Sequence, residues 1–237
     1  MAKRGQATRL PAIRKANDAG IPILILDTRI DAAAAASMGA EIVTFIGSDN
    51  FEGGAVAGRY LARALGGTGS VAIIEGISGH ETADRRRLGF LQGVEAHPGI
   101  RVVASQTADW ERARAYTVAE NLLQAHPDLD AIFAANDEMA LGALEAVDAA
   151  GRIAHVRVVG FDAIPDALAN IAKGRLAGSV AQFPGEMGRL GVRHAVALLR
   201  DGTVPPAEIL TRVELIDRTN VGAFTTRRPA ASPREEP

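Results

Sequence analysis

The chain has 237 residues, of which 47% are hydrophobic and 23% are charged, and its formal net charge at pH 7 is −2. This length can bury a sizeable core in one large domain or two smaller ones, and the charge lacks the basic excess of a nucleic-acid-binding protein. The sequence contains no cysteine, which excludes disulfides, thiolate nucleophiles and cysteine-ligated metals.

The first twenty residues are basic but contain no apolar run typical of a secretory signal, and no segment has the length and apolarity of a membrane span. Short runs rich in Val and Ile then alternate with segments of helical period, which predicts an α/β fold built on a parallel sheet. The predicted strands are 21–27, 42–48, 70–76, 100–106, 129–135, 156–162 and 177–182. The predicted helices are 8–20, 50–65, 81–96, 111–126, 137–150, 164–174 and 184–200.

The two ends of the chain depart from this pattern. A strand as apolar as IPILILD (21–27) is typically covered on both sides, yet only one predicted helix precedes it. We therefore expect an exposed strand edge, which favours aggregation or self-association. Residues 223–237 mix Pro, Ser and alternating charges with little to bury, and this composition predicts a disordered tail.

Polar residues follow five of the predicted strands, and ligands of open parallel sheets bind at the carboxyl ends of strands. These residues are Asp27, Asp49, Asn136, Asp162 and Gln182. Their side chains can make paired hydrogen bonds to neighbouring hydroxyl groups. Arg86, in TADRRRLGF, adds a cation, and the sole tryptophan, Trp110, adds a planar surface that can cover a sugar ring. Together they predict a site for a polyhydroxyl ligand.

The same residues have structural alternatives. Asp49, Asn136 and Asp162 stand at helix starts, where Asp and Asn are preferred caps. Asp27 could serve as a turn residue, and Gln182 could bond to the backbone at a strand end. An arginine within an Arg-Arg-Arg run is often solvated, and a lone tryptophan often packs against the core.

Signals for catalysis are weak. The five histidines show no metal-ligand spacing, and no GxSxG motif occurs. The segment GGTGS (66–70) has the composition of a phosphate loop, but it precedes its strand and lacks the lysine, so we interpret it as a turn. We therefore predict that the chain is not an enzyme and that it uses no metal and no cofactor.

From about residue 8 to 220, the sequence resembles the ribose-binding type of periplasmic sugar-binding protein, the solute receptor of ABC importers. The segments that carry the resemblance are KANDAGIPILILD, IGSDNFEGGAVAG, ADRRRLGF, ASQTADW, LLQAHPDLDAIFAANDEMALGAL, VRVVGFDAIPDAL and GSVAQFPGEMG. The resemblance implies the type I periplasmic-binding-protein fold, in which two Rossmann-like lobes joined by three crossovers close over a sugar. It implies a periplasmic location and importer membrane subunits as partners, without nucleic acid and without direct membrane insertion.

The resemblance also implies roles for individual residues. Asp27 would bind sugar hydroxyls from the first lobe, and Trp110 would cover the ring. Phe161, which precedes the ligand aspartate as it does in the family, would also contact the ligand. Binding from the second lobe and hinge would come from Arg86, Asn136, Asp162 and Gln182. Of the neighbours Asn136 and Asp137, we expect the first to face the ligand and the second to start the helix.

The sequence departs from the family pattern in three ways. The family usually has Asp-Arg where this chain has Asp27-Thr28, with Arg29 one place later, so the ligand could differ from ribose. A tryptophan at 110 replaces the family's phenylalanine. The opening strands of the family have no counterpart, so we expect a truncated first lobe and weak or absent sugar binding. The expected division is 1–48 plus 183–211 for the first lobe and 49–182 plus 212–222 for the second.

Two other functions are compatible with the same α/β pattern. The effector domain of lactose-repressor-type transcription regulators has the same fold and similar NDEMALGAL-like segments, but TADW and VELIDRTN favour the importer receptor. A dinucleotide-dependent enzyme is disfavoured because no GxGxxG motif follows the first strand.

Overall fold

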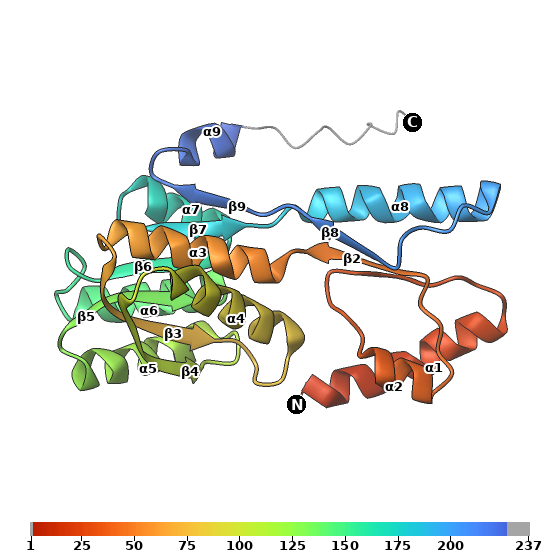
Figure 1. Ribbon diagram of the computed structural model, residues 1–237, viewed down its shortest axis with the longest axis horizontal. Helices are drawn as coiled ribbons and strands as arrows, with labels where there is room; N and C mark the ends of the chain where they lie inside the picture. The colour runs from red at the N-terminus through yellow and green to blue at the C-terminus, as the bar shows by residue number, and fades with distance from the viewer. Residues whose placement is uncertain (1, 227–237) are drawn as a thin grey trace.

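The computed structural model describes residues 2–226, with side chains from residue 9 onward, and arranges their strands in two sheets along the long axis of the molecule (Figure 1). The helices are α1 (Ala2–Asp18), α2 (Ala32–Ser37), α3 (Asn50–Ala64), α4 (Glu81–Glu95), α5 (Arg112–Ala125), α6 (Asp137–Ala149), α7 (Pro165–Ala172), α8 (Pro184–Asp201) and α9 (Val221–Thr226). The strands are β1 (Leu24–Leu26), β2 (Thr44–Ser48), β3 (Thr68–Glu75), β4 (Gly99–Thr107), β5 (Leu129–Ala134), β6 (Arg157–Asp162), β7 (Gly178–Ala181), β8 (Glu208–Thr211) and β9 (Glu214–Asp217).

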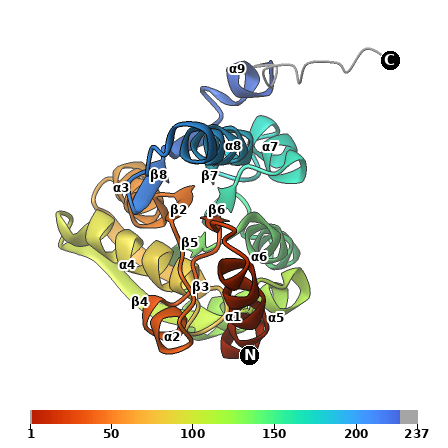
Figure 2. The ribbon, with the colours of Figure 1, turned by 90° about the vertical axis from the view of Figure 1, so that its right-hand side faces the viewer.

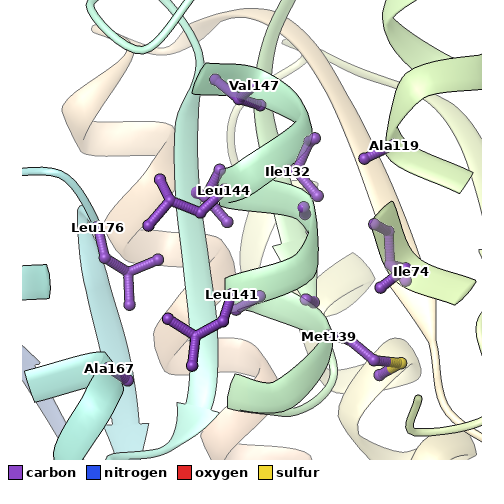
Figure 3. Packing of buried hydrophobic residues seen from close by; sticks show 14 of the residues in the cluster. Ile74, Ala119, Ile132, Met139, Leu141, Leu144, Val147, Ala167 and Leu176 are labelled. Atoms are coloured by element: carbon purple, nitrogen blue, oxygen red, sulfur yellow. The ribbon is translucent and has the colours of Figure 1, made fainter. Parts of the chain in front are cut away.

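The larger sheet has six strands in the order β4-β3-β5-β6-β7-β9, all parallel except β9, which pairs antiparallel with β7. Side chains alternate between its two faces, so Ile73 packs with α3 and α4 while its neighbour Ile74 packs with α5 and α6. On the face covered by α5 and α6, the side chains of Leu141, Leu144 and Val147 of α6 pack against the sheet (Figure 3). The near-continuous apolar runs recognised in the sequence are therefore strands covered on both faces.

The smaller sheet has three parallel strands in the order β1-β2-β8. Helix α8 packs on one face through Met187 and Leu190, which contact Ile46 of β2. Helices α1 and α2 lie on the opposite side of β2 (Figures 1 and 2). Among the described strands, β1 pairs with β2 alone, so its other edge carries no strand.

The chain passes between the sheets three times, from β2 into α3, from β7 into α8, and from β8 into β9 (Figure 1). The short connections at these points hold the two sheets next to each other. The carboxyl ends of β1, β6 and β7 lead into a common crevice between the sheets.

All seven predicted strands and all seven predicted helices are present, while α2, β8, β9 and α9 were not predicted. Each of these four elements has at most six residues, too few for a clear period. Helix α2 is nonetheless capped, because the Asp31 Oδ1 accepts a hydrogen bond from the Ala34 N–H at 2.7 Å.

The predicted disordered tail, 223–237, is wrong for its first four residues, which belong to α9. Val221 is buried, and the Phe224 ring meets the Phe183 ring edge to face with centroids 6.3 Å apart. These apolar contacts order a segment whose composition alone predicts disorder. Residues 227–237 lie outside the described residues.

Candidate functional site

A crevice of about 280 Å³ lies between the two sheets, at the carboxyl ends of strands from both. Polar, charged and aromatic side chains line it, and nearly all of them can donate or accept hydrogen bonds. They are Asp27, Thr28, His80, Thr82, Arg86, Trp110, Asn136, Asp162 and Gln182. Six of the seven residues predicted from the sequence are thus brought together, although they come from six different segments of the chain.

Arg86 is the buried cation of this site, with only 4% of its surface exposed. Its Nε donates to the Asn50 Oδ1 at 2.9 Å, and its Nη1 donates to the Ala135 carbonyl at 2.7 Å and to the Asp162 Oδ1 at 3.3 Å. Burial lowers the pKa of Arg86, and the nearby carboxylates of Asp162 and Asp27 raise it again. The guanidinium therefore has a fixed direction, which suits recognition of a ligand oxygen.

Packing fixes the guanidinium as well. Its carbon lies 3.6 Å from the centroid of the Phe161 ring and 5.8 Å from that of Trp110. The backbone of Arg86 is held by close packing of α4 on α3, because a Cβ at Gly54 would lie 2.0 Å from the Arg86 carbonyl oxygen. Only glycine at position 54 permits this approach.

Asp162 ends β6 and is the main acceptor of the site. Its Oδ1 accepts a hydrogen bond from the Gln182 Nε2 at 2.6 Å in addition to the one from Arg86. Burial raises the pKa of Asp162, and the charge of Arg86 opposes that rise. Gln182, directly after β7, is thus a partner of Asp162 within the crevice wall.

The three-stranded sheet contributes Asp27 and Thr28 to the opposite wall. Asp27 has a left-handed backbone (φ 68°), and its N–H donates to the Ile46 carbonyl at 2.9 Å. The Thr28 hydroxyl donates to the Asp27 Oδ2 at 3.2 Å. Arg29 points elsewhere, because it pairs with Glu81 at 3.0 Å and with Glu208.

Asn136 combines both roles considered for it. It lines the crevice, and its Oδ1 also caps α6 by accepting a hydrogen bond from the Met139 N–H at 2.9 Å. The expectation that Asp137 merely starts this helix is incomplete, because its fully buried carboxylate turns away from the crevice towards Ser179 and Ile164. Asp49 caps α3 and does not line the crevice, as its structural alternative predicts.

The prediction that Phe161 contacts the ligand needs correction. Its side chain is fully buried in the core between the sheet and α3, and it does not line the crevice. Successive residues of a strand point to opposite faces, so the residue before Asp162 faces the core. The Phe161 ring packs against the guanidinium of Arg86 from the side of the core.

Thr28, His80 and Thr82 line the crevice without having been predicted. His80 and Thr82 stand after β3, but four residues separate the end of that strand from His80, so a search for the first polar residue after the strand misses them. His80 lies edge to face with Trp110, with ring centroids 6.2 Å apart. Fixed donors and acceptors on two walls beside an indole can hold several hydroxyl groups at once.

No group of three or more His, Cys, Asp or Glu side chains in the described part of the chain could hold a metal ion. No helix within residues 2–226 has the length and apolarity needed to cross a membrane.

Two curated proteins of Escherichia coli are similar to this chain in sequence. The chain is 44% identical to the ribose import binding protein RbsB of Escherichia coli over 189 residues. The aligned segment covers 80% of this chain and 61% of that protein. It is 37% identical over 199 residues to the D-allose-binding periplasmic protein of Escherichia coli, covering 84% of this chain and 64% of that protein.

Among solved structures, the fold is similar to that of an ABC transporter periplasmic solute binding protein from Actinobacillus succinogenes with bound D-allose. The TM-score is 0.85 at 38% identity, covering 90% of this chain and 74% of the other. The chain spans about three fifths of the length of the curated relatives described above, 61% and 64%. The sequence profile described as "Periplasmic binding protein domain" matches residues 3–203, and the chain therefore belongs to the periplasmic binding protein family.

Proposed function

We propose that this chain binds a monosaccharide in the crevice and acts as the solute-binding component of an ABC importer in the periplasm. The observation that carries the proposal is the convergence of Arg86, Asp162 and Gln182 with the indole of Trp110 in one small polar crevice. A carboxylate and a guanidinium grip the hydroxyl-bearing edge of a sugar, while an aromatic face covers its C–H groups.

The size of the crevice limits the ligand to a small molecule. A volume of about 280 Å³ lies at the lower end of the range for ligand pockets, so we expect one sugar ring. Relatives support this class: the solved structures include proteins with bound D-allose, with bound myo-inositol and with bound alpha-D-tagatopyranose. No bond is made or broken in such a role.

The proposed mechanism is closure of two lobes around the sugar. We assign 1–48 with 183–211 to one lobe and 49–182 with 212–222 to the other, and α9 extends the second lobe to residue 226. The strand membership of the two sheets and the three crossings between them support this division. A ligand that contacts both walls favours the closed form, which would dock on the importer's membrane subunits.

The two walls of the crevice contribute unequal numbers of lining residues. Asp27 and Thr28 come from the three-stranded sheet and its loop, whereas the other seven lining residues belong to the second lobe and the connection after β7. We therefore expect the second lobe to supply most of the binding free energy, with a dissociation constant weaker than about 1 µM.

Isothermal titration of the chain with D-ribose and D-allose tests the proposal. Asp162→Ala removes the central acceptor and leaves Arg86 with one partner fewer, so affinity should fall by about tenfold or more. Asp49→Ala is the matched control, because Asp49 also follows a strand and caps a helix but lies outside the crevice.

The control variant should lose helix-cap stability without losing affinity. Absence of heat with both sugars and with a wider set of monosaccharides would reject the proposal for this chain. Equal affinity of the Asp162→Ala variant and the wild type would place the sugar elsewhere.

A further inference from the structure

We infer that Asp137 and Ser179 are positioning residues for sugar recognition: neither touches the crevice, yet together they hold the turn that aims the Asp162 carboxylate into it. The inference rests on the proposed function and deepens it, because it identifies how the second lobe presents its main acceptor. A buried hydrogen-bond network joins α6, β7 and the turn between β6 and α7.

The network uses both oxygens of the Asp137 carboxylate. The Ser179 hydroxyl donates to the Asp137 Oδ1 at 2.7 Å, and the Ile164 N–H donates to the Asp137 Oδ2 at 2.9 Å. The Ser179 Oγ in turn accepts a hydrogen bond from the Ala163 N–H at 3.0 Å. Two consecutive backbone N–H groups after Asp162 are therefore held by side chains from elsewhere in the fold.

The turn that they hold is strained. Asp162 has a φ of 115° and Ala163 a φ of 54°, in the region that L-residues other than glycine rarely adopt. Each such residue costs about 1–3 kcal/mol, and it persists only where the surrounding structure over-determines it. The two side-chain hydrogen bonds at Ala163 and Ile164 restrain this backbone directly, beyond the point where β6 pairs with β7 at Asp162.

The absence of a side chain at Gly160 leaves space for the Asp137 carboxylate. Asp137 and Ser179 both have no exposed surface, and a Cβ at Gly160 would lie 2.1 Å from the Asp137 Oδ1. Glycine at 160 on β6 thus leaves the room into which Asp137 turns. In addition, Ile164 stands at the N-cap of α7 and has no side-chain oxygen, so Asp137 supplies the capping oxygen from another helix.

The consequence for the ligand follows from geometry. The Asp162 side chain reaches Gln182 and Arg86 from this backbone conformation, and a change in φ at Asp162 would turn the carboxylate relative to both partners. The pKa of Asp137 is raised to about 7, chiefly by burial, while the hydrogen bonds from Ser179 and Ile164 oppose that rise.

The first experiment is a double-mutant cycle measured by isothermal titration with D-ribose and D-allose. Asp137→Asn should weaken sugar affinity by about tenfold when Asp162 is present and by less than about twofold in the Asp162→Ala background. Such dependence separates positioning of Asp162 from general loss of stability, which would lower affinity equally in both backgrounds.

Ser179→Ala should weaken affinity in the same direction by several-fold. Ser70→Ala is its matched control, because Ser70 is also a buried strand serine bonded to an aspartate, Asp128, but lies at the opposite end of the sheet. The control should leave sugar affinity unchanged. Equal loss in the Ser179 and Ser70 variants, or an unchanged affinity of the Asp137→Asn variant, would overturn the inference.

Amide hydrogen exchange of the sugar-free protein provides a readout that needs no ligand. The amides of Ala163 and Ile164 should exchange faster in the Asp137→Asn and Ser179→Ala variants, while those of β5 keep their wild-type rates. If wild type binds neither these two sugars nor the wider set of monosaccharides, the proposed function fails, and the exchange measurement still decides whether the network holds the turn. Unchanged exchange at both amides would reject the network's role directly.

Discussion

The buried carboxyl group of Asp137 contributes a pH dependence to the stability of this protein. The folded state raises the pKa of Asp137 from an ordinary 3.8 to about 7, chiefly through burial. Between these values the folded state binds more protons than the unfolded state, so the free energy of unfolding falls as pH rises. The stabilising contribution is complete below pH 3.8 and is lost as pH passes about 7.

We expect denaturant unfolding at about pH 5 and about pH 8 to show a larger drop in stability for wild type than for Asp137→Asn, whose side chain cannot titrate. Asp49→Asn should keep the wild-type drop, since Asp49 lies at an ordinary helix cap. Identical pH profiles of wild type and the Asp137→Asn variant would show that another group causes the dependence.

The neighbours Asn136 and Asp137 also show what a sequence can reveal about single residues. Their place at the end of a strand identified a polar pair at the edge of the crevice, and the cap at Asn136 follows from its residue type. The partner of Asp137 could not be predicted, because Ser179 is 42 positions away and is brought to it by the order of β6 and β7 in the sheet.

Among the elements, the contact between α3 and α4 controls the position of Arg86. A Cβ at Gly54 would lie 2.0 Å from the Arg86 carbonyl, so Gly54→Ala must push α4 away. We expect a loss of about 1–3 kcal/mol in the free energy of unfolding, together with weaker sugar binding. Gly188→Ala on α8 is the control: no atom lies within 4 Å of its added Cβ, so it should gain about 0.5–1 kcal/mol.

Both variants place alanine inside a helix, so helix propensity favours both equally. Thermal or denaturant unfolding would separate them by the sign of the change. A stabilised Gly54→Ala variant would show that the close packing of the two helices does not limit the fold.

Some of the helices and strands can be predicted from their local sequence, and others cannot. Strands such as β5 and β6 carry apolar runs between helices of clear period, and those signals predicted seven strands and seven helices. The short strands β8 and β9 follow a proline pair, and their pairing with β2 and β7 depends on segments more than thirty residues earlier. No local pattern encodes such pairing, so the sequence alone did not reveal these strands.

At the scale of the whole molecule, an ion pair outside the crevice lining joins the loop after β1 to the helix α4 of the other sheet. Arg29, in the loop after β1, has its Nε 3.0 Å from the Glu81 Oε1 at the start of α4, and it also pairs with Glu208 of its own sheet. Glu81→Gln breaks the pair between the two sheets, together with a longer contact of 3.9 Å to Arg85 on the same helix. Glu208→Gln breaks the pair within one sheet. The two substitutions are therefore matched in chemistry and differ in position.

We expect Glu81→Gln to favour an open form and to weaken sugar affinity by up to about fivefold, the range of a partly exposed pair worth 0.2–1 kcal/mol. Small-angle scattering should show a larger radius of gyration for this variant than for Glu208→Gln. High salt should reduce the difference, because it screens exposed charges. Equal radii at low salt would mean that the pair does not restrain the two sheets.

The three-stranded sheet leaves apolar surface exposed next to its open edge. Val192 of α8 has 67% of its surface exposed and follows Gly191, which lies against Leu26 of β1, itself 42% exposed. Exposed apolar side chains beside an open strand edge favour association between copies of a chain. The prediction of self-association from the apolar strand at 21–27 thus keeps a structural basis.

We expect the apparent mass in sedimentation velocity to rise with protein concentration and Val192→Lys to reduce that rise, because a charge on the apolar surface must be desolvated on association. Leu88→Lys is the control, since Leu88 is also an exposed helical residue, at 46%, but lies on α4 of the other sheet. The control variant should associate like wild type. A wild type that stays monomeric at all concentrations would show that the edge of β1 is protected in solution. If Val192→Lys and Leu88→Lys reduced the rise in apparent mass equally, the change in net charge would explain the effect, because each substitution adds one positive charge.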